Sequence, residues 1–133
     1  LERSDRILFW IREKTGRRIG HIGLYRLNPE DCSCEIDNVM RGCPYAPKGI
    51  MANALQALIS WSFDVLQNQS LELTVFADNE RAITLYVRCG LKVTKEIPLK
   101  KVFDNDGYHW EETDNLVLAE RFNLKMRINN PAE

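Results

Sequence analysis

The chain has 133 residues, and its 18 Lys and Arg against 19 Asp and Glu give a formal net charge of −1. Its 44% hydrophobic and 28% charged residues are typical of a globular protein and exclude a disordered or low-complexity chain. The near-neutral charge argues against a nucleic-acid partner, and no apolar run approaches the roughly 20 residues of a membrane helix. We expect one domain over residues 1–133, with neither nucleic acid nor membrane as a partner.

The first third of the chain predicts three strands. Ile7–Glu13 and Arg18–Arg26 flank a polar turn in which Gly16 can supply a positive φ, so they predict a β-hairpin. Cys34–Met40 predicts a third strand. Its two-residue period divides the side chains between two faces, with Cys34, Ile36, Asn38 and Met40 on one and Glu35, Asp37 and Val39 on the other.

The middle of the chain predicts a long helix followed by a strand. A loop rich in Gly and Pro over residues 41–49 leads into the helix, which we expect from about Pro47 to Leu66, because proline is tolerated in a first helical turn. The apolar residues of this helix form a wide stripe, as expected of a helix that packs on a sheet. Leu71–Ala77 then predicts a strand with one inward face.

The last part of the chain predicts a short helix and a hairpin. Asn79 is a candidate N-cap for a helix over Glu80–Cys89. Extended sequence follows over Leu91–Phe103, and strand-like sequence resumes after a polar turn over Tyr108–Glu112 and Leu116–Phe122. The order β-β-β-α-β-α-β-β predicts an α+β fold with a mixed α/β sheet, antiparallel strands first, and helices on both faces.

The cysteines and histidines do not predict a metal site. Their spacing fits no closed zinc site, so we expect no metal ligands among Cys32, Cys34, Cys43, Cys89, His21 and His109. Free thiols are the default in a reducing cytosol, which makes the cytoplasm the expected location.

Two segments carry candidate chemistry. In the loop before the long helix, Lys48 adds a positive charge and Gly49 lets a ligand approach a helix N-terminus, which can hold a phosphate. The alternative is a plain loop that starts a helix. Asn79 and Tyr86 are seven residues apart, about two helical turns, so both can reach one extended ligand. The alternatives are a simple N-cap for Asn79 and a packing aromatic for Tyr86.

The second segment resembles a known family. The residues that carry the resemblance follow a strand at a fixed spacing: Asn79, Ala82, Tyr86 and Gly90. This spacing is similar to the N-x-x-A-x-x-x-Y-x-x-x-G-F pattern of the GNAT superfamily of N-acetyltransferases. Upstream, the strand, loop and helix at Glu35–Leu66 lie where that family binds acetyl-CoA, and Ala57–Leu66 resembles its ribosomal-protein and amino-sugar acetylating branches. The resemblance covers about Arg18 to Phe122 and implies a GNAT-like fold with acetyl-CoA as co-substrate.

The resemblance also implies roles for individual residues. In that family, the strand before the loop splays away from its neighbour, and its backbone pairs with the pantetheine arm of the cofactor. The implied cofactor-binding residues are Val39, Met40, Arg41, Lys48, Gly49, Ile50, Met51, Asn79 and Tyr86. Tyr86 is implied to protonate the departing thiolate, and Glu35 and Asp37 are the candidates for the base that receives the amine proton.

The implied function is transfer of an acetyl group from acetyl-CoA to a primary amine by direct attack through a tetrahedral intermediate. Ala46, Met51 and Leu91 depart from the family pattern. Ala46, Met51 and the short N-terminus make a degenerate, non-catalytic acyl-CoA-binding or protein-interaction module the alternative. The acceptor is left open among a small metabolite, an amino sugar and a protein N-terminus. An aromatic and acidic hairpin over Leu99–Glu112 suits a sugar or a cationic amine, or forms a cross-strand aromatic cluster.

The resemblance makes the chain short at its N-terminus, because such proteins usually begin with a strand and one or two helices before the first hairpin. The chain then is a fragment, lacks one wall of the acceptor site, or borrows cover from a partner chain. We expect an exposed edge or apolar patch near the first strands, covered by a homodimer contact.

Overall fold

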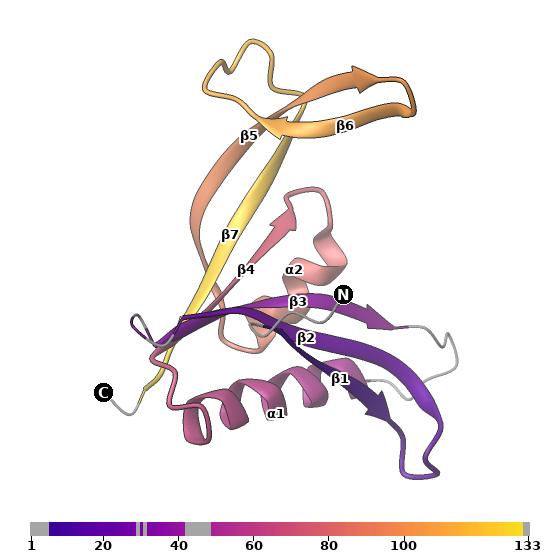
Figure 1. Cartoon of the computed structure of the whole chain (residues 1–133), viewed down its shortest axis with the longest axis vertical. Helices are drawn as coiled ribbons and strands as arrows, with labels where there is room; N and C mark the ends of the chain where they lie inside the picture. Colours follow the sequence, from indigo (N-terminus) through magenta and orange to yellow (C-terminus); the bar gives the residue numbers. More distant parts are fainter. Residues whose placement is uncertain (1–5, 29, 31, 42–48, 132–133) are drawn as a thin grey trace.

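The computed structural model describes residues 6–28, 30, 32–41 and 49–131. Seven strands form one mixed sheet in the order β1-β2-β3-β4-β7-β5-β6 (Figure 1). The elements in chain order are β1 Ile7–Arg12, β2 Arg18–Asn28, β3 Ser33–Arg41, α1 Ile50–Asp64, β4 Ser70–Phe76, α2 Glu80–Arg88, β5 Lys92–Asp104, β6 Gly107–Glu112 and β7 Arg121–Asn129. The predicted mixed sheet is confirmed: β3 and β4 are parallel, and the other paired strands are antiparallel.

The strand expected over Leu116–Phe122 is wrong for most of its length. Residues 116–118 form a turn, in which the N–H of Val117 donates to the Asn115 side-chain oxygen at 3.0 Å and that of Leu118 donates to the Asn115 carbonyl at 3.0 Å. These local hydrogen bonds satisfy backbone groups that would otherwise pair with a neighbouring strand, and they outweigh the β-propensity of the apolar residues 116–118. The last strand, β7, begins at Arg121 and inserts between β4 and β5.

The two described helices cover one face of the sheet, so the expectation of helices on both faces is wrong for the described residues. Leu71 of β4 is fully buried in the core beneath α1, whereas its neighbour Glu72 is half-buried and Thr74 is exposed. The end of α2 meets the start of α1, where the Cys89 Sγ lies 3.7 Å from the Ala52 carbonyl oxygen. The other face of β4 offers few apolar side chains on which a helix could pack.

The hydrophobic core lies between the helices and this covered face. Its α1 members follow helical spacing, and the strands contribute alternate residues. The buried apolar residues of α1 and β4 are Leu55, Leu58, Ile59, Phe63, Leu71, Leu73 and Val75.

The neighbouring strands β3 and β4 diverge soon after they meet. They pair only from Ser33 with Ser70 to Glu35 with Glu72, although β3 continues to Arg41 and β4 to Phe76. Figure 1 shows β3 running across the molecule while β4 rises away from it. The sheet therefore opens into a V whose arms are β1–β3 and β4–β7–β5–β6.

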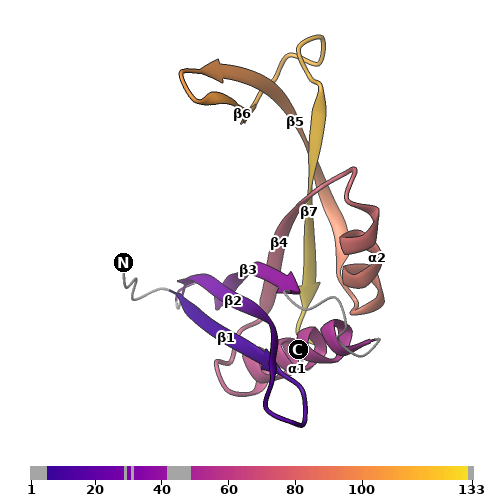
Figure 2. The same ribbon diagram turned by 90° about the vertical axis from the view of Figure 1, so that its right-hand side faces the viewer.

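The far end of the second arm is the β5–β6 hairpin. β5 pairs with β7 from Lys92 to Leu99 and with β6 from Leu99 to Asp104. Figure 2 shows this hairpin and β1–β3 extending to the same side of β4 and β7, away from α2. We call this side of the sheet the open face.

The edge strand β1 carries the exposed apolar residues expected near the first strands. Leu8 is 48% and Trp10 is 49% exposed. In the described part of the chain, no helix is long and apolar enough to cross a membrane.

Candidate active site

The point where β3 and β4 separate places two carboxylates side by side. Glu35 and Glu72 are paired across the parallel ladder, so their side chains point to the same face. Because Leu71 points into the core, that face is the open one. Glu72 is bonded to two cations of β7, with Lys125 Nζ at 3.5 Å and Arg127 Nη1 at 3.4 Å.

β3 has a bulge just beyond Glu35. Gly23 of β2 pairs with Asp37 and His21 pairs with Met40, so two residues of β3 lie opposite the single Ile22. A bulge leaves a backbone group without a ladder partner and interrupts the two-residue period, so the strict alternation predicted along this strand ends there. The backbone of Asp37, Val39, Met40 and Arg41 lies in this segment, while their side chains fall outside the described part.

The start of α1 exposes backbone donors. Gly49 is the N-cap with φ 85°, a left-handed conformation that glycine adopts without strain, and no side chain among the described residues caps this helix end. Ile50 and Met51 form the first turn and are half-buried against the core. Lys48 and Pro47 lie outside the described residues.

Helix α2 holds the predicted Asn79 and Tyr86. Asn79 is the exposed N-cap, and its side-chain oxygen accepts a hydrogen bond from the backbone N–H of Ala82 at 3.3 Å. Tyr86 is 8% exposed and belongs to the core cluster. Burial raises the pKa of the Tyr86 phenol, which therefore stays protonated at neutral pH.

The two histidines occupy different surroundings. The Nδ1 of His21 is buried without a hydrogen-bond partner among the described residues, and its ring lies edge-on to Trp10 at 5.8 Å. His109, on the exposed hairpin, has both ring nitrogens engaged: Nδ1 lies 2.8 Å from Asp104 and Nε2 lies 2.5 Å from Glu111. Because both nitrogens are already occupied, His109 is poorly placed to act as a proton shuttle.

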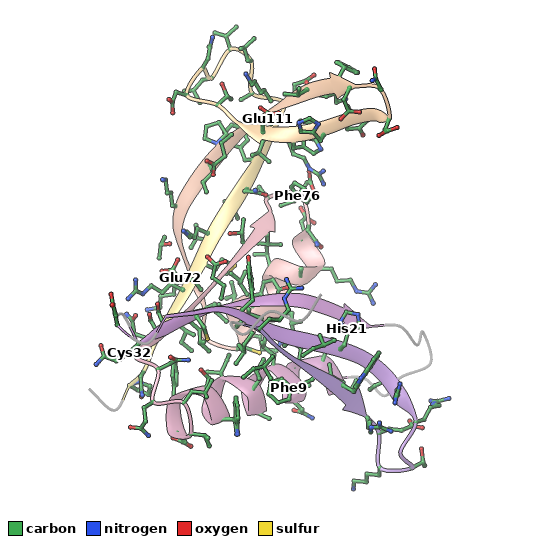
Figure 3. The ribbon with its side chains drawn as sticks, in the orientation of Figure 1. Phe9, His21, Cys32, Glu72, Phe76 and Glu111 are labelled. Carbon is green, nitrogen blue, oxygen red and sulfur yellow. The ribbon has the colours of Figure 1, made fainter. Side chains whose placement is uncertain are left out.

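A cluster that the sequence did not reveal lies at the far end of β4. Arg121 of β7 donates two hydrogen bonds to Asp78, at 2.7 and 2.9 Å, and lies 3.5 Å from the ring centre of Phe76. Its guanidinium is also 5.6 Å from the ring of Trp110, and Lys101 Nζ lies 5.5 Å from that ring. Figure 3 shows Glu72 and Phe76 along β4, with the hairpin that bears Glu111 beyond them. The pairing of β7 with β4 and β5, and of β5 with β6, brings these residues together.

The family model that matches the chain is the acetyltransferase (GNAT) domain, over residues 1–92. This range ends just after the spacing from Asn79 to Gly90, so most of β5 and all of β6 and β7 lie beyond the match. Comparison with curated proteins finds no match.

Solved structures of the Vibrio cholerae spermidine N-acetyltransferase SpeG share the fold. The form in complex with CoA and spermine has a TM-score of 0.75 at 19% identity, covering 95% of this chain and 66% of that chain. A chimera of SpeG with hSSAT has a TM-score of 0.74 at 20% identity, covering 95% of this chain and 70% of that chain. A dodecameric form of SpeG has a TM-score of 0.73 at 20% identity, covering 95% of this chain and 66% of that chain.

The family match covers more than half of the chain, and the fold with its diverging strands agrees with it. The chain belongs to the GNAT family of acetyltransferases, and it is an acyl-CoA-dependent N-acetyltransferase with acetyl-CoA as co-substrate.

Proposed function

We propose that the protein transfers the acetyl group of acetyl-CoA to a primary amine by direct attack, through a tetrahedral intermediate. The observation that carries this proposal is the divergence of β3 from β4 beyond Glu35, next to a helix that begins after Gly49 and whose end no described side chain caps. A gap between two strands leaves backbone groups free to pair with an extended amide-containing arm, and an uncapped helix end favours phosphate.

In this proposal the cofactor lies along the first arm of the V. The backbone of Val39, at the bulge, and of Met40 and Arg41, beyond it, pairs with the pantetheine amides. Lys48 and the first-turn N–H groups at Gly49, Ile50 and Met51 hold the pyrophosphate, because helix N-termini carry a partial positive charge. Asn79 and Tyr86 contact the arm from α2.

The chemistry then needs three groups. An unpaired N–H at the bulge, assigned to Val39, stabilises the oxyanion, since a preorganised donor is worth most where charge develops. Glu35 or Asp37 receives the proton that the amine loses when it attacks the thioester carbonyl. Tyr86 gives a proton to the departing thiolate, a role that suits a phenol kept neutral by burial. No covalent intermediate on a cysteine is required.

We also infer that residues 1–133 form a single acetyltransferase-like domain that pairs with a second copy. Leu8 and Trp10 point to the same side of the edge strand β1 and are half-exposed, and such an edge favours association. Light scattering on a dilute solution tests this inference, because a monomer at micromolar concentration contradicts it.

The test of the proposed function is calorimetry with acetyl-CoA, followed by an assay for released thiol with a panel of amines. The panel includes spermine, since a structural neighbour is described in complex with it. Binding at micromolar concentration with thiol release in the presence of an amine is the expected result. Absence of binding at millimolar acetyl-CoA contradicts the proposal, whereas binding without turnover on any amine favours a non-catalytic module.

A further inference from the structure

The open face of the second arm carries a row of cations. Opposed residues of antiparallel strands point to the same side, and Arg127 and Lys125 point to the open face because they bond Glu72. Their partners on β5 therefore lie on that face too. We call the following residues the basic track: Lys92 with Arg127, Lys95 with Lys125, and Lys101 with Arg121 further along.

Much of this positive charge is not neutralised by the protein itself. Glu72 is shared by two cations of the track, and Asp78 is bonded to Arg121. Lys92 and Lys95 are exposed and make no ion pair among the described residues. Lys101 lies 4.4 Å from the ring centre of Tyr108. The remaining carboxylate on the strands of this face is Glu112, which pairs with Leu99, so the six cations outnumber Glu72, Asp78 and Glu112. Asp114 and Glu120 lie in the loop between β6 and β7.

The acids of the hairpin do not offset the track. Asp104 and Glu111 both bond His109, and Glu111 is opposite Lys100, on the side of the hairpin away from Trp110. The hairpin thus presents aromatic rings and cations to the open face, which disagrees with the cationic acceptor that its acidic residues suggested. A polyamine that approached this face would meet like charge.

The charges of the two arms are complementary to one kind of acceptor. Glu35 on the first arm suits an ammonium group, and the second arm suits anionic groups. The track follows β7 from Arg127 to Arg121 and continues to Lys101, and strands rise about 3.3 Å per residue, so it is on the order of 20 Å long. A small metabolite cannot reach along this length, whereas an extended peptide of about six residues can.

We propose that the acceptor is an acidic polypeptide, whose terminal amine enters the V beside Glu35 and whose carboxylates lie along the basic track. This inference rests on the proposed acetyl transfer. A nucleic acid could also meet the track, but it offers no aliphatic amine for the reaction. The peptide carries both of the groups that the two arms recognise.

The first experiment compares three synthetic peptides that share their first two residues and continue with acidic, neutral or basic residues. Thiol release with acetyl-CoA is measured for each peptide at low and at high salt. We expect the KM of the acidic peptide to be at least tenfold below that of the neutral one, and this advantage to shrink at high salt, because salt screens exposed charges. Equal KM values, or a preference for the basic peptide or for spermine, overturn the inference while acetyl transfer stands.

The second experiment reverses charge on the track. The double variant Lys92→Glu with Lys95→Glu should raise the KM for the acidic peptide about tenfold or more and leave the KM for acetyl-CoA unchanged. The matched control is Lys14→Glu with Arg88→Glu. It makes the same change in net charge at exposed positions in the turn between β1 and β2 and on α2. An equal effect in both double variants overturns the inference.

Direct binding separates this inference from the proposed function. Fluorescence anisotropy of a labelled acidic peptide reports on the track even where no thiol is released. Binding by the wild-type protein that the track variant loses, in a protein without turnover, supports the track as a site for an acidic peptide but overturns the peptide's role as acceptor together with the proposed function. No binding of the peptide, or tighter binding of a single-stranded oligonucleotide that displaces it, overturns the inference.

Discussion

The two faces of the seven-stranded sheet differ in what their side chains do. On the covered face, Leu71 and Met126 are fully buried and form one core with α1 and α2. On the open face, one residue further along the same strands, Glu72 and Arg127 bond each other and remain accessible. Because alternate residues of a strand point to opposite faces, each strand contributes to stability on one side and to recognition on the other. Substitutions on the two faces should therefore separate stability from activity.

The largest expected effect is on the covered face. Leu71→Ala removes a fully buried side chain, and core substitutions of this kind cost about 2–5 kcal/mol of unfolding free energy, through lost burial and the cavity left behind. Thr74→Ala, on the exposed face of the same strand, is the control, and it should change stability by at most about 0.5 kcal/mol. Urea unfolding measures both variants. Similar losses for the two substitutions would remove the distinction between the faces.

The next largest effect is expected on kcat, from Tyr86, the proposed catalytic residue whose side chain lies in the core. Tyr86→Phe keeps the buried ring and removes only the hydroxyl, so we expect kcat to fall by about 100-fold, the lower end of what general acid catalysis contributes. Acetyl-CoA binding by calorimetry and the unfolding midpoint serve as controls, and both should change little. An unchanged kcat would show that Tyr86 serves packing alone, as its place in the core also allows.

The parts of the fold that local patterns govern could be predicted from the sequence. The alternation of Leu71 with Leu73, the turn at Gly16 and the spacing from Asn79 to Gly90 depend on neighbouring residues, and each appears near its predicted place. The position of β7 could not be predicted, because it depends on pairing with β4, about fifty residues earlier in the chain.

The basic track was missed for the same reason. Lys92 and Arg127 are far apart in the sequence and become neighbours only through the ladder between β5 and β7. The bulge in β3 was also missed, since nothing in Asp37–Met40 itself demands an extra residue. The motif predicted the family, whereas the charges around the site depend on long-range pairing.

A smaller effect is expected at the start of α2, where capping and cofactor contact meet in one residue. Asn79→Ala removes the bond to the Ala82 N–H and should cost about 1 kcal/mol of stability. Asn79→Asp is the matched variant, because aspartate caps as well as asparagine but cannot donate a hydrogen bond. If Asn79 donates to the cofactor, both variants lose acetyl-CoA affinity while only the alanine variant loses stability. Full affinity in the aspartate variant would leave Asn79 as an N-cap alone.

The smallest effect should lie on the side of the hairpin that faces away from the track, in the contacts of His109. The ring can bond both carboxylates as a donor only when both nitrogens carry protons, so Glu111 first, and then Asp104, raise the pKa of His109 above its ordinary 6.5. A raised pKa means that the folded state holds the proton more tightly than the unfolded state does. The resulting stabilisation is fully present below about pH 6.5 and is lost as pH rises through the folded pKa.

His109→Gln should therefore lower the urea midpoint slightly at about pH 6, and this effect should shrink as the pH rises through the folded-state pKa, where the ring loses its proton. The pKa of Asp104 is lowered, chiefly by the hydrogen bond from His109, so its share of stability is present above its ordinary 3.8 and lost as pH falls further. The difference in urea midpoint between wild type and variant should thus be largest between the ordinary pKa of Asp104 and that of His109.

Because Asp104, His109 and Glu111 lie away from the basic track, the KM for the acidic peptide should be the same in the wild type and the variant. A changed KM would mean that charge on either side of the hairpin reaches the acceptor, which would break the distinction between the two faces.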